Sequence, residues 1–439
     1  MAPFIDSIRS VARRCSSQSS GCSHLRVPPT MVTLDAHGDM MLLVGKQKCI
    51  HESCNDERQN RQPNAICFRL NSAIIAGASP AFGLALYSPS AETTRHDGVK
   101  WTVNLPDDDP QAMQTIITIL YGHYPVSSFD KHMEIEQLLQ LTVVADKYDL
   151  VHLFPKWSAQ WLRDMERYWV DRTFVRQSTE DLESLLWIFW VLGHEPLYTY
   201  MVLQIAFYSE LDAAGKLTDP AEQLCFTNEF REVPLPPCAP FEIGLARIEV
   251  LKIIRRDIKQ TIEEHLHGRQ QGQAQSSRCR RADGENDAGW RQSVLASLLE
   301  MLRAEGIWPV PPADRLTASP RSLVEIFRVN PNIPAFAHHH HGKGEGEGDG
   351  GRSSCDADGP FWARVEALLH EARFALSAAA AGHLSEQAAK SGLAGYFASK
   401  DLGVHLRPDK GCWSLKDILA FQAAVSRAAA DKDQQPRWI

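Results

Sequence analysis

An alternation of apolar and polar residues gives way to a helical repeat at residues 99–124 of the chain. Apolar side chains fall on one face of the alternating part, at Val99, Trp101, Val103 and Leu105. A period of two predicts a half-buried strand. Asp109 then precedes Pro110, a pair that favours a helix start. The aspartate carboxylate can accept hydrogen bonds from backbone N–H groups of the first turn, and the N–H that proline lacks would have no acceptor within the helix at this position. Apolar residues at helical spacing follow, at Met113, Ile116, Ile117 and Leu120.

The same patterns predict other short elements on both sides of this stretch. Apolar or alternating runs at 40–44 and 66–70 predict two more strands. Asn71 or Ser72 can cap a short helix over residues 74–75, and Ser79-Pro80 begins another helix. A further amphipathic helix is expected from residue 135 to residue 148. Strands and helices that are not strictly alternating predict an α+β unit over residues 31–150.

Beyond this unit the pattern is helical. Aromatic residues recur every three to four positions at Phe154, Trp157 and Trp161, a spacing typical of core packing. Apolar periodicity predicts helices at 182–192, where Gly193 can cap the end, and then at 196–208, 243–266, 294–302, 361–369 and 414–425. We therefore expect a helical region at 151–267, a helical segment at 289–331 and C-terminal helices at 360–439.

Three stretches have compositions that cannot bury a core. They are a Ser- and Arg-containing leader at 1–30, a polar linker at 268–288 and a low-complexity linker at 332–359. We expect all three to be disordered. The leader also resembles a mitochondrial transit peptide in composition, which leaves two interpretations of it open.

Six short motifs occur in the order in which they stand in a known family. They are Gly38-Asp39, Phe68 to Ile75, Ala78 to Phe82, Leu105 to Pro110, Ile119 to Gly122 and Ala145 to Tyr148. Together they resemble a BTB/POZ domain, specifically that of BTB proteins of filamentous fungi. The helical stretch LLWIFWVLGHEPLY and the later GIWP also resemble that family. The resemblance implies a three-stranded sheet flanked by helices, a fold used for self-association and partner binding.

The resemblance also implies where partners bind. An acid at the position of Asp39 lies near a charged pocket in the family, although repressor-type members carry a basic residue where this chain has Asn71 and Ser72. Cullin-binding members carry an apolar-x-Glu motif that residues 83–89 lack. Leu84, Leu86 and Tyr87 of this segment could still face a partner. Together with Asp39 they are the candidate partner-binding residues. For Leu86, core packing is an equally good interpretation.

Composition narrows the class of protein. The formal charge of −8 argues against broad binding of nucleic acid or anionic membranes. Ten cysteines without a small-domain spacing, and no secretory signal, indicate reduced thiols. We therefore expect an intracellular protein, cytoplasmic or nuclear, that binds proteins and neither nucleic acid nor membrane.

Candidate chemical motifs are few. Gly77-Ala78-Ser79-Pro80-Ala81 superficially resembles a hydrolase nucleophile elbow, but Pro80 has no N–H for an oxyanion, so Ser79 is better explained as a helix cap. One group of residues has zinc-ligand types, namely Cys49, His51, Cys54 and Cys67, and the alternative is that the cysteines are small apolar residues. The histidines at 338–341 and the glycines at 346–351 lack the context of a metal or phosphate site.

These observations assign no catalytic residue, no cofactor and no metal. The sequence predicts a non-enzymatic interaction protein that acts as a scaffold or adaptor, by BTB-mediated self-association (a homodimer being one form) or by partner recruitment. Two alternatives stay open: a substrate adaptor of a cullin-type ubiquitin ligase, and a zinc-dependent regulatory protein.

Overall fold

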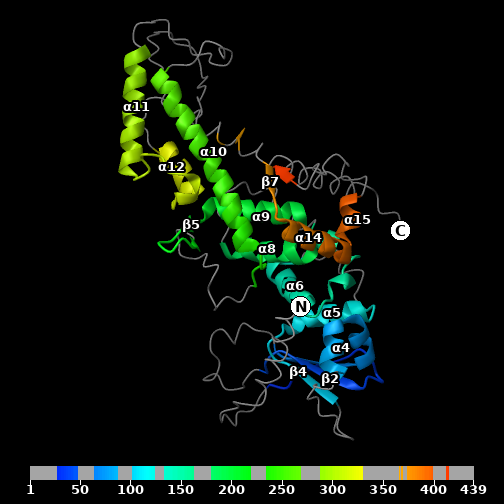
Figure 1. Ribbon diagram of the computed structural model, residues 1–439. Coiled ribbons are helices and arrows are strands. Elements are labelled where there is room, and N and C mark those ends of the chain that lie inside the picture. The colour runs from blue at the N-terminus through cyan, green and yellow to red at the C-terminus, as the bar shows by residue number, and fades with distance from the viewer. Residues whose placement is uncertain are drawn as a thin grey trace, which may run out of the picture.

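A computed structural model describes residues 27–47, 64–87, 101–123, 133–162, 179–218, 234–267, 287–329 and 373–398, with the short pieces 365, 367–368 and 412–414. A small sheet with its helices forms one end of the described structure (Figure 1). A pair of helices lies in the middle, and a long helical hairpin extends to the other end. The fold is therefore α+β at the N-terminal end and mainly α-helical beyond it.

The sheet is mixed and has four strands in the order β1-β3-β2-β4. The strands are β1 (Thr30–Thr33), β2 (Met40–Val44), β3 (Ile66–Leu70) and β4 (Trp101–Leu105). Strand β2 is antiparallel to β3 and parallel to β4, whereas β1 is parallel to β3. The three predicted strands are confirmed, although Val99 and Lys100 lie outside the described residues.

The fourth strand corrects the expectation of three strands. Three of the four β1 residues are exposed, so no apolar alternation marked the strand in the sequence. Thr30 also lies within the stretch expected to be a leader, and the sheet therefore begins one residue earlier than the predicted boundary. Residues 1–26 of the expected leader lie outside the described residues. The expected linker at 332–359 also lies outside them.

Helices α3 (Ser72–Ala78), α4 (Pro80–Tyr87), α5 (Pro110–Leu120) and α6 (Ile135–Lys147) accompany the sheet, followed by the short 3-10 helix η3 (Val151–Leu153). Their starts are where the sequence placed them. The Asp109 carboxylate accepts the Ala112 N–H at 2.7 Å, and Pro110 is the first residue of α5. The Asn71 side chain caps α3 by accepting the Ala73 N–H at 2.9 Å.

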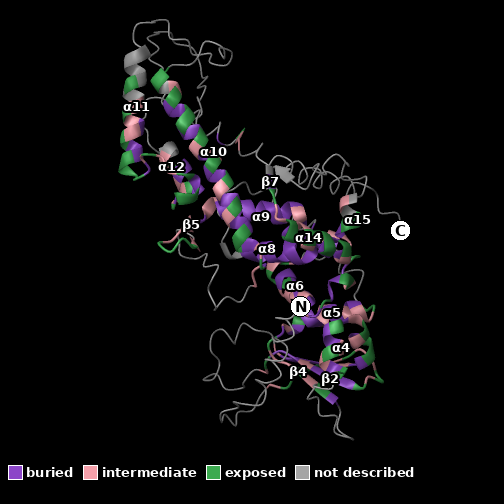
Figure 2. Cartoon of the chain, viewed as in Figure 1, coloured by how far each residue is buried: buried purple, intermediate pink, exposed green. Residues whose placement is uncertain are grey.

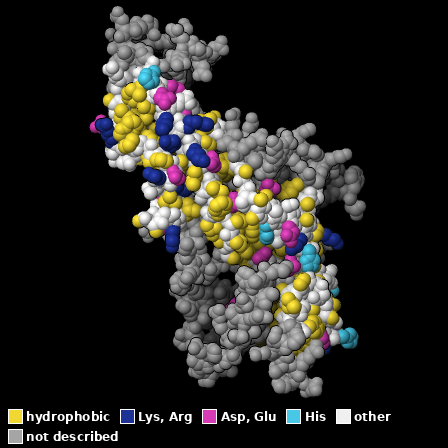
Figure 3. Space-filling view, viewed as in Figure 1, with side chains coloured by type: hydrophobic (Ala, Val, Ile, Leu, Met, Phe, Trp, Pro, Cys, Tyr) yellow, Lys and Arg dark blue, Asp and Glu magenta, His cyan; other side chains and the backbone are white. Residues whose placement is uncertain are grey.

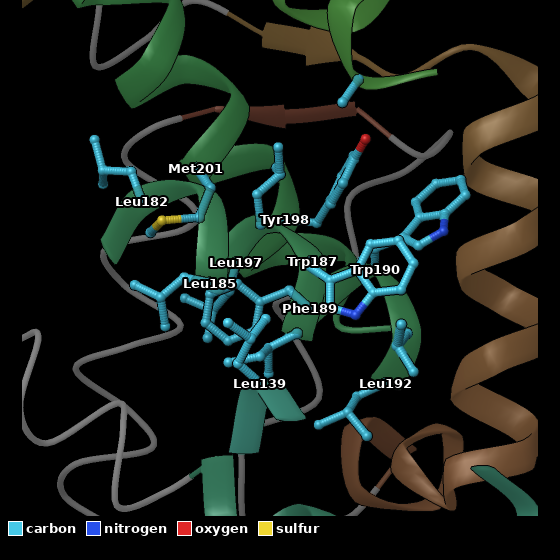
Figure 4. Close-up of a cluster of buried hydrophobic side chains, with 14 of the residues drawn as sticks. Leu139, Leu182, Leu185, Trp187, Phe189, Trp190, Leu192, Leu197, Tyr198 and Met201 are labelled. Carbon is cyan, nitrogen blue, oxygen red and sulfur yellow. The ribbon is translucent and has the colours of Figure 1, made fainter. Parts of the chain in front are cut away.

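The middle of the molecule is the pair α8 (Thr179–Leu192) and α9 (Glu195–Tyr208). Side chains from both helices, with Leu139 of α6, gather into one apolar cluster (Figure 4). Gly193 joins the helices at φ +77°, a conformation in which glycine lacks the steric cost of a side chain. A Cβ there would lie 2.1 Å from the Ala388 amide nitrogen, so no larger residue fits between α8 and α14 (Ala378–Ser391).

The long helix α10 (Ala239–His267) packs on α9 and forms a hairpin with α11 (Asp287–Ala304) (Figure 1). The short 3-10 helix η4 (Ala313–Arg315) and α12 (Pro320–Val329) fold back onto α10. A two-stranded ribbon, β5 (Glu210–Leu211) and β6 (Leu217–Thr218), follows α9. The predicted linker at 268–288 lies outside the described residues up to 286, and its last two residues belong to α11.

Arg247 of α10 is a buried arginine that fastens this region together. It is 1% exposed and donates to the carbonyl oxygens of Ser209 (3.0 Å), Leu316 (2.7 Å), Thr317 (3.0 Å) and Ala318 (2.8 Å). Burial lowers its pKa to about 10, which still leaves it charged at neutral pH. A single side chain therefore joins the end of α9, the middle of α10 and the chain before α12.

The C-terminal part differs from the prediction. Helices α14 and α15 (Leu393–Ala398) lie within the region 360–439 that was expected to be helical, but the sequence analysis located no individual helix there, because the Ala-rich run has little apolar contrast. The strands β7 (Arg373–Ala375) and β8 (Cys412–Ser414) pair antiparallel. Residues 365, 367 and 368 are helical within the predicted helix at 361–369. The helix predicted at 414–425 lies outside the described residues after Ser414.

Candidate protein-interaction surface

Asp39, at the start of β2, takes part in a hydrogen-bond network with the helices beside the sheet. Its carboxylate accepts the Ser72 N–H at 2.8 Å and the Ser72 hydroxyl at 2.7 Å. The Ser72 and Tyr87 hydroxyls lie 2.6 Å apart, and since Ser72 gives its proton to Asp39, Tyr87 donates to Ser72. Gly38 permits the close approach, because a Cβ there would lie 2.6 Å from the Leu70 carbonyl oxygen. Asp39 therefore fixes the start of α3 and the orientation of Tyr87.

The sequence proposed three residues of α4 for partner binding, and two of them are exposed. Leu84 is 59% exposed and Tyr87 is 48% exposed. They stand three positions apart and so share one face of the helix. Ile74 of α3 is also 40% exposed. Leu86 is 4% exposed and belongs to the core, so the core-packing interpretation holds and Leu86 offers nothing to a partner. We call Ile74, Leu84 and Tyr87 the α3–α4 surface.

Tyr87 is held at both ends of its side chain. Its hydroxyl is bonded to Ser72, and its ring meets the Trp101 ring edge-on at 6.0 Å and 71°. Trp101 is itself buried in the sheet. An aromatic side chain that is already ordered loses little conformational entropy when a partner binds, which favours its use as an anchor.

The other end of α4 is attached to α6. The Ser79 hydroxyl donates to the Tyr148 carbonyl oxygen at 2.6 Å and accepts the Phe82 N–H at 3.0 Å, so Ser79 is a helix cap, as predicted. The Phe82 and Tyr148 rings stack at 4.2 Å. The helix that carries Leu84 and Tyr87 is therefore a rigid platform rather than a loose surface helix.

Tyr148 also joins α6 to the acidic turn after β4. Its hydroxyl donates to Asp108 at 2.5 Å, and the Lys147 ammonium contacts the other Asp108 oxygen at 2.5 Å. Burial, followed by the charge of Asp108, raises the Tyr148 pKa well above its ordinary value, so the phenol keeps its proton. Of the three successive aspartates 107–109, Asp108 is the buried one, at 8% exposed.

Of the four residues considered as zinc ligands, the structure describes one, Cys67. Cys67 lies on β3, 7% exposed, and burial raises the pKa of its thiol. Cys49, His51 and Cys54 lie outside the described residues, as do the histidines at 338–341. Within the described ranges no group of three or more His, Cys, Asp or Glu side chains is placed to hold a metal ion. None of the described helices combines the length and the apolarity needed to cross a membrane.

Two residues of the site were not singled out from the sequence, Ser72 and Tyr148. Ser72 was considered as a helix cap and as one of two positions where repressor-type BTB members carry a basic residue, whereas it bridges Asp39 and Tyr87. Tyr148 appeared only as part of a motif. Its role depends on Asp108, which is 40 positions away, and no local pattern reports such a contact.

Comparison of the chain with protein-family models, with curated proteins and with solved structures found no match.

Proposed function

We propose that this chain is a non-enzymatic interaction protein whose N-terminal α+β unit is a BTB/POZ-like domain of the filamentous-fungal type. The ordered motifs from Gly38 to Tyr148 support the family, and the order of β2, β3, α3, α4 and β4 agrees with it. The observation that carries the function is the exposure of Leu84 and Tyr87 on a helix that is fixed at both ends.

The physical case is that an exposed apolar pair on a rigid helix is costly unless something covers it. Singly exposed apolar residues are ordinary on protein surfaces. Here two of them share one helix face, one being an aromatic ring with a fixed orientation. Aromatic anchors of this kind contribute a large share of binding energy in protein interfaces. The occupant we propose is a protein, either a second copy of the chain or a separate partner.

The test is a charge placed at the centre of the α3–α4 surface. We expect Leu84→Asp, alone and with Tyr87→Ser, to lower the mass of the purified full chain measured by light scattering, or to remove specific partners from affinity purification. Leu266→Asp is the matched control, because Leu266 is an exposed leucine (56%) on α10. Unchanged mass and an unchanged set of partners in the Leu84 variants would contradict the proposal.

The exposure of Leu84 and Tyr87 also favours a second candidate, a substrate adaptor of a cullin-type ubiquitin ligase. Co-purification of a cullin with the chain from its native host, lost in Leu84→Asp but kept in Leu266→Asp, would select this candidate. Absence of any cullin from wild-type purifications would eliminate it and leave self-association or another partner.

A further inference from the structure

Helix α14 packs on α8 and α9, although it belongs to a distant part of the sequence (Figure 1). Helix α12 ends at Val329 and β7 begins at Arg373, so residues 330–372 connect α12 to the segment that carries α14. A connection of this length can span several times the distance that a helix must travel to leave its neighbour. Helix α14 can therefore separate from α8 while α12 stays in place.

The side that α14 turns towards its neighbours buries little apolar area. The buried residues of this helix are Ala380, Leu384, Gln387, Ala388 and Ser391, and Leu384 is the one large apolar side chain among them. Helix α9 instead buries leucine, isoleucine, methionine and tyrosine side chains on all its sides. Because hydrophobic stabilisation is roughly proportional to the buried apolar area, α14 gains less from packing than α9 does.

Polar atoms on α14 and on the side of α8 beneath it are buried without a hydrogen-bond partner among the described residues. They are Nε2 of His383 and Oε1 of Gln387 on α14, and Nε1 of Trp187 on α8. The His383 ring stacks on Trp190 at 3.9 Å, and Trp187 shares that side of α8, three positions earlier. Burying such atoms opposes the packing of α14, because they give up hydrogen bonds to water and gain none in return.

The contacts that hold α14 in place are largely polar and lie near its C-terminal end. The Ser158 hydroxyl donates to the Ser391 carbonyl oxygen, and the Ser391 hydroxyl donates to the Leu192 carbonyl oxygen, both at 2.7 Å. Lys390 forms an ion pair with Asp149 at 3.2 Å, where the Asp149 side chain is 52% exposed. Figure 3 shows charged side chains of both signs grouped on this part of the surface. Since water can replace hydrogen bonds and screens exposed ion pairs, these contacts position α14 more than they strengthen its attachment.

We propose that α14 is a strap, attached through a polar and imperfectly paired contact, that opens from α8 and α9 while the rest of the described structure stays folded. Opening uncovers Trp187 and Trp190, which are 7% and 6% exposed when the strap is closed. It also lets the unpartnered atoms bond to water, which offsets part of the free energy that separating the helices costs. The strap thus makes exposure of an aromatic face of α8 reversible.

Hydrogen exchange of the full-length chain, followed by mass spectrometry, tests whether α14 opens by itself. After correction for intrinsic rates, we expect amides of α14 to exchange at least about tenfold faster than those of α8 and α9, because they exchange through the local opening. Equal protection of the three helices would overturn the proposal, since it would mean that they open only together.

Gln387→Leu tests whether the imperfect pairing is what lets the strap open. The substitution replaces an unpartnered buried acceptor by an apolar group of similar size, and we expect it to slow exchange of α14 about threefold or more. Gln111→Leu is the matched control, because Gln111 is exposed on α5, and it should leave exchange of α14 unchanged. Unchanged or faster exchange of α14 in Gln387→Leu would overturn the proposal.

Leu384→Asp forces the strap open and shows how far the opening extends. We expect the loss of protection to be confined to residues 373–398, with α8 and α9 still protected, and tryptophan fluorescence to become more strongly quenched by acrylamide as Trp187 and Trp190 are uncovered. Loss of protection throughout α8 and α9 would overturn the strap, because α14 would then belong to one cooperative core. Leu84→Asp should leave exchange of α14 unchanged, so this inference and the α3–α4 surface stand or fail separately.

Discussion

Helices α9 and α10 lie side by side, yet their surroundings are opposite. Residues 196–206 of α9 are buried without interruption, whereas α10 alternates between buried and exposed positions along its length (Figure 2). Helix α9 is enclosed by α8, α10, α12 and α14, so apolar residues occupy every side of it. Helix α10 contacts α9, α11, η4 and α12 and, within the described residues, keeps exposed positions along its length.

The difference separates the two uses of an apolar side chain in this protein. On α8 and α9, the buried side chains of Trp187, Trp190, Tyr198 and Tyr200 stabilise the middle of the molecule and are unavailable to a partner while α14 is docked. On α10 and α4, a few exposed apolar residues stand on helices whose other sides are already packed. Partner binding is therefore expected at the α3–α4 surface, and stability is expected to depend most on the enclosed middle.

The strongest test of the enclosed middle is Gly193→Ala. The residue has φ +77°, and a Cβ would lie 2.1 Å from the Ala388 amide nitrogen and 2.5 Å from the Leu384 carbonyl oxygen. Strain in the left-handed region and overpacking against backbone should together lower the free energy of unfolding by about 4 kcal/mol. Urea denaturation followed by circular dichroism measures it.

Gly215→Ala is the control for this prediction. Gly215 has the same φ, +77°, but a Cβ there meets nothing within 4 Å among the described residues. Only the conformational cost remains, about 1 kcal/mol. Similar losses in the two variants would show that the space between α8 and α14 is not what requires glycine at 193.

The next largest loss of stability is expected at Arg247, where α10 of the α10–α11 hairpin packs on α9. Arg247→Met removes the donor to four backbone carbonyl oxygens and leaves these acceptors inside the protein, which should cost about 3 kcal/mol. Thermal unfolding compared with Arg256→Met, a change at an exposed arginine of the same helix, measures it. A loss in Arg247→Met no greater than that in Arg256→Met would mean that the four bonds do not fasten α10 to its neighbours.

Two leucines on α4 test the same distinction at the other end of the molecule. Leu86→Ala removes a side chain that is 4% exposed and should destabilise the chain by about 2 to 3 kcal/mol. Leu84→Ala removes one that is 59% exposed and should change stability by less than about 0.5 kcal/mol. Denaturant midpoints of the two variants check the assignment, and equal midpoints would place Leu84 in the core.

Much of the fold could be predicted because its signals are local. The caps at Asp109 and Asn71, and the end of α8 at Gly193, depend on residues within a few positions of each other. Strand β1 and helix α14 were missed for the same reason, since neither carries local apolar contrast. Their positions depend on β3 and on the α8–α9 pair, which lie far from them in the sequence.

The candidate surfaces were harder to predict than the fold. Leu84 and Leu86 are two positions apart with identical side chains, and only tertiary packing makes one exposed and the other buried. The outer charges of α10 were recognised as mixed, and the exposed side chains include both acids, Glu249 and Glu263, and bases such as Lys252. The resemblance implied that Asp39 lies near a charged pocket, and its two hydrogen bonds from Ser72, 33 positions away, could not be predicted from local sequence.

The smallest expected effect is the pH dependence of stability that arises where α14 packs on α8. His383 of α14 stacks on Trp190 of α8 with ring centroids 3.9 Å apart and planes at 9°. Burial lowers its pKa below the ordinary 6.5, helped by the charge of Lys390 and opposed by that of Glu386. The unfolded chain therefore binds a proton more readily than the folded one, so the neutral-ring contribution to stability is complete above pH 6.5 and declines as pH falls through the folded-state pKa.

His383→Phe keeps a stacked ring that does not titrate. We expect the thermal midpoint of this variant to fall less than that of the wild type between about pH 7.5 and about pH 5.5. His37→Phe is the control, because His37 is exposed and lies outside this interface. If the thermal midpoints of His383→Phe and of the wild type fall by the same amount, titration of His383 does not contribute to the pH dependence of stability. If only His383→Phe resists acid, protonation of His383 accounts for the acid sensitivity of the contact between α14 and α8.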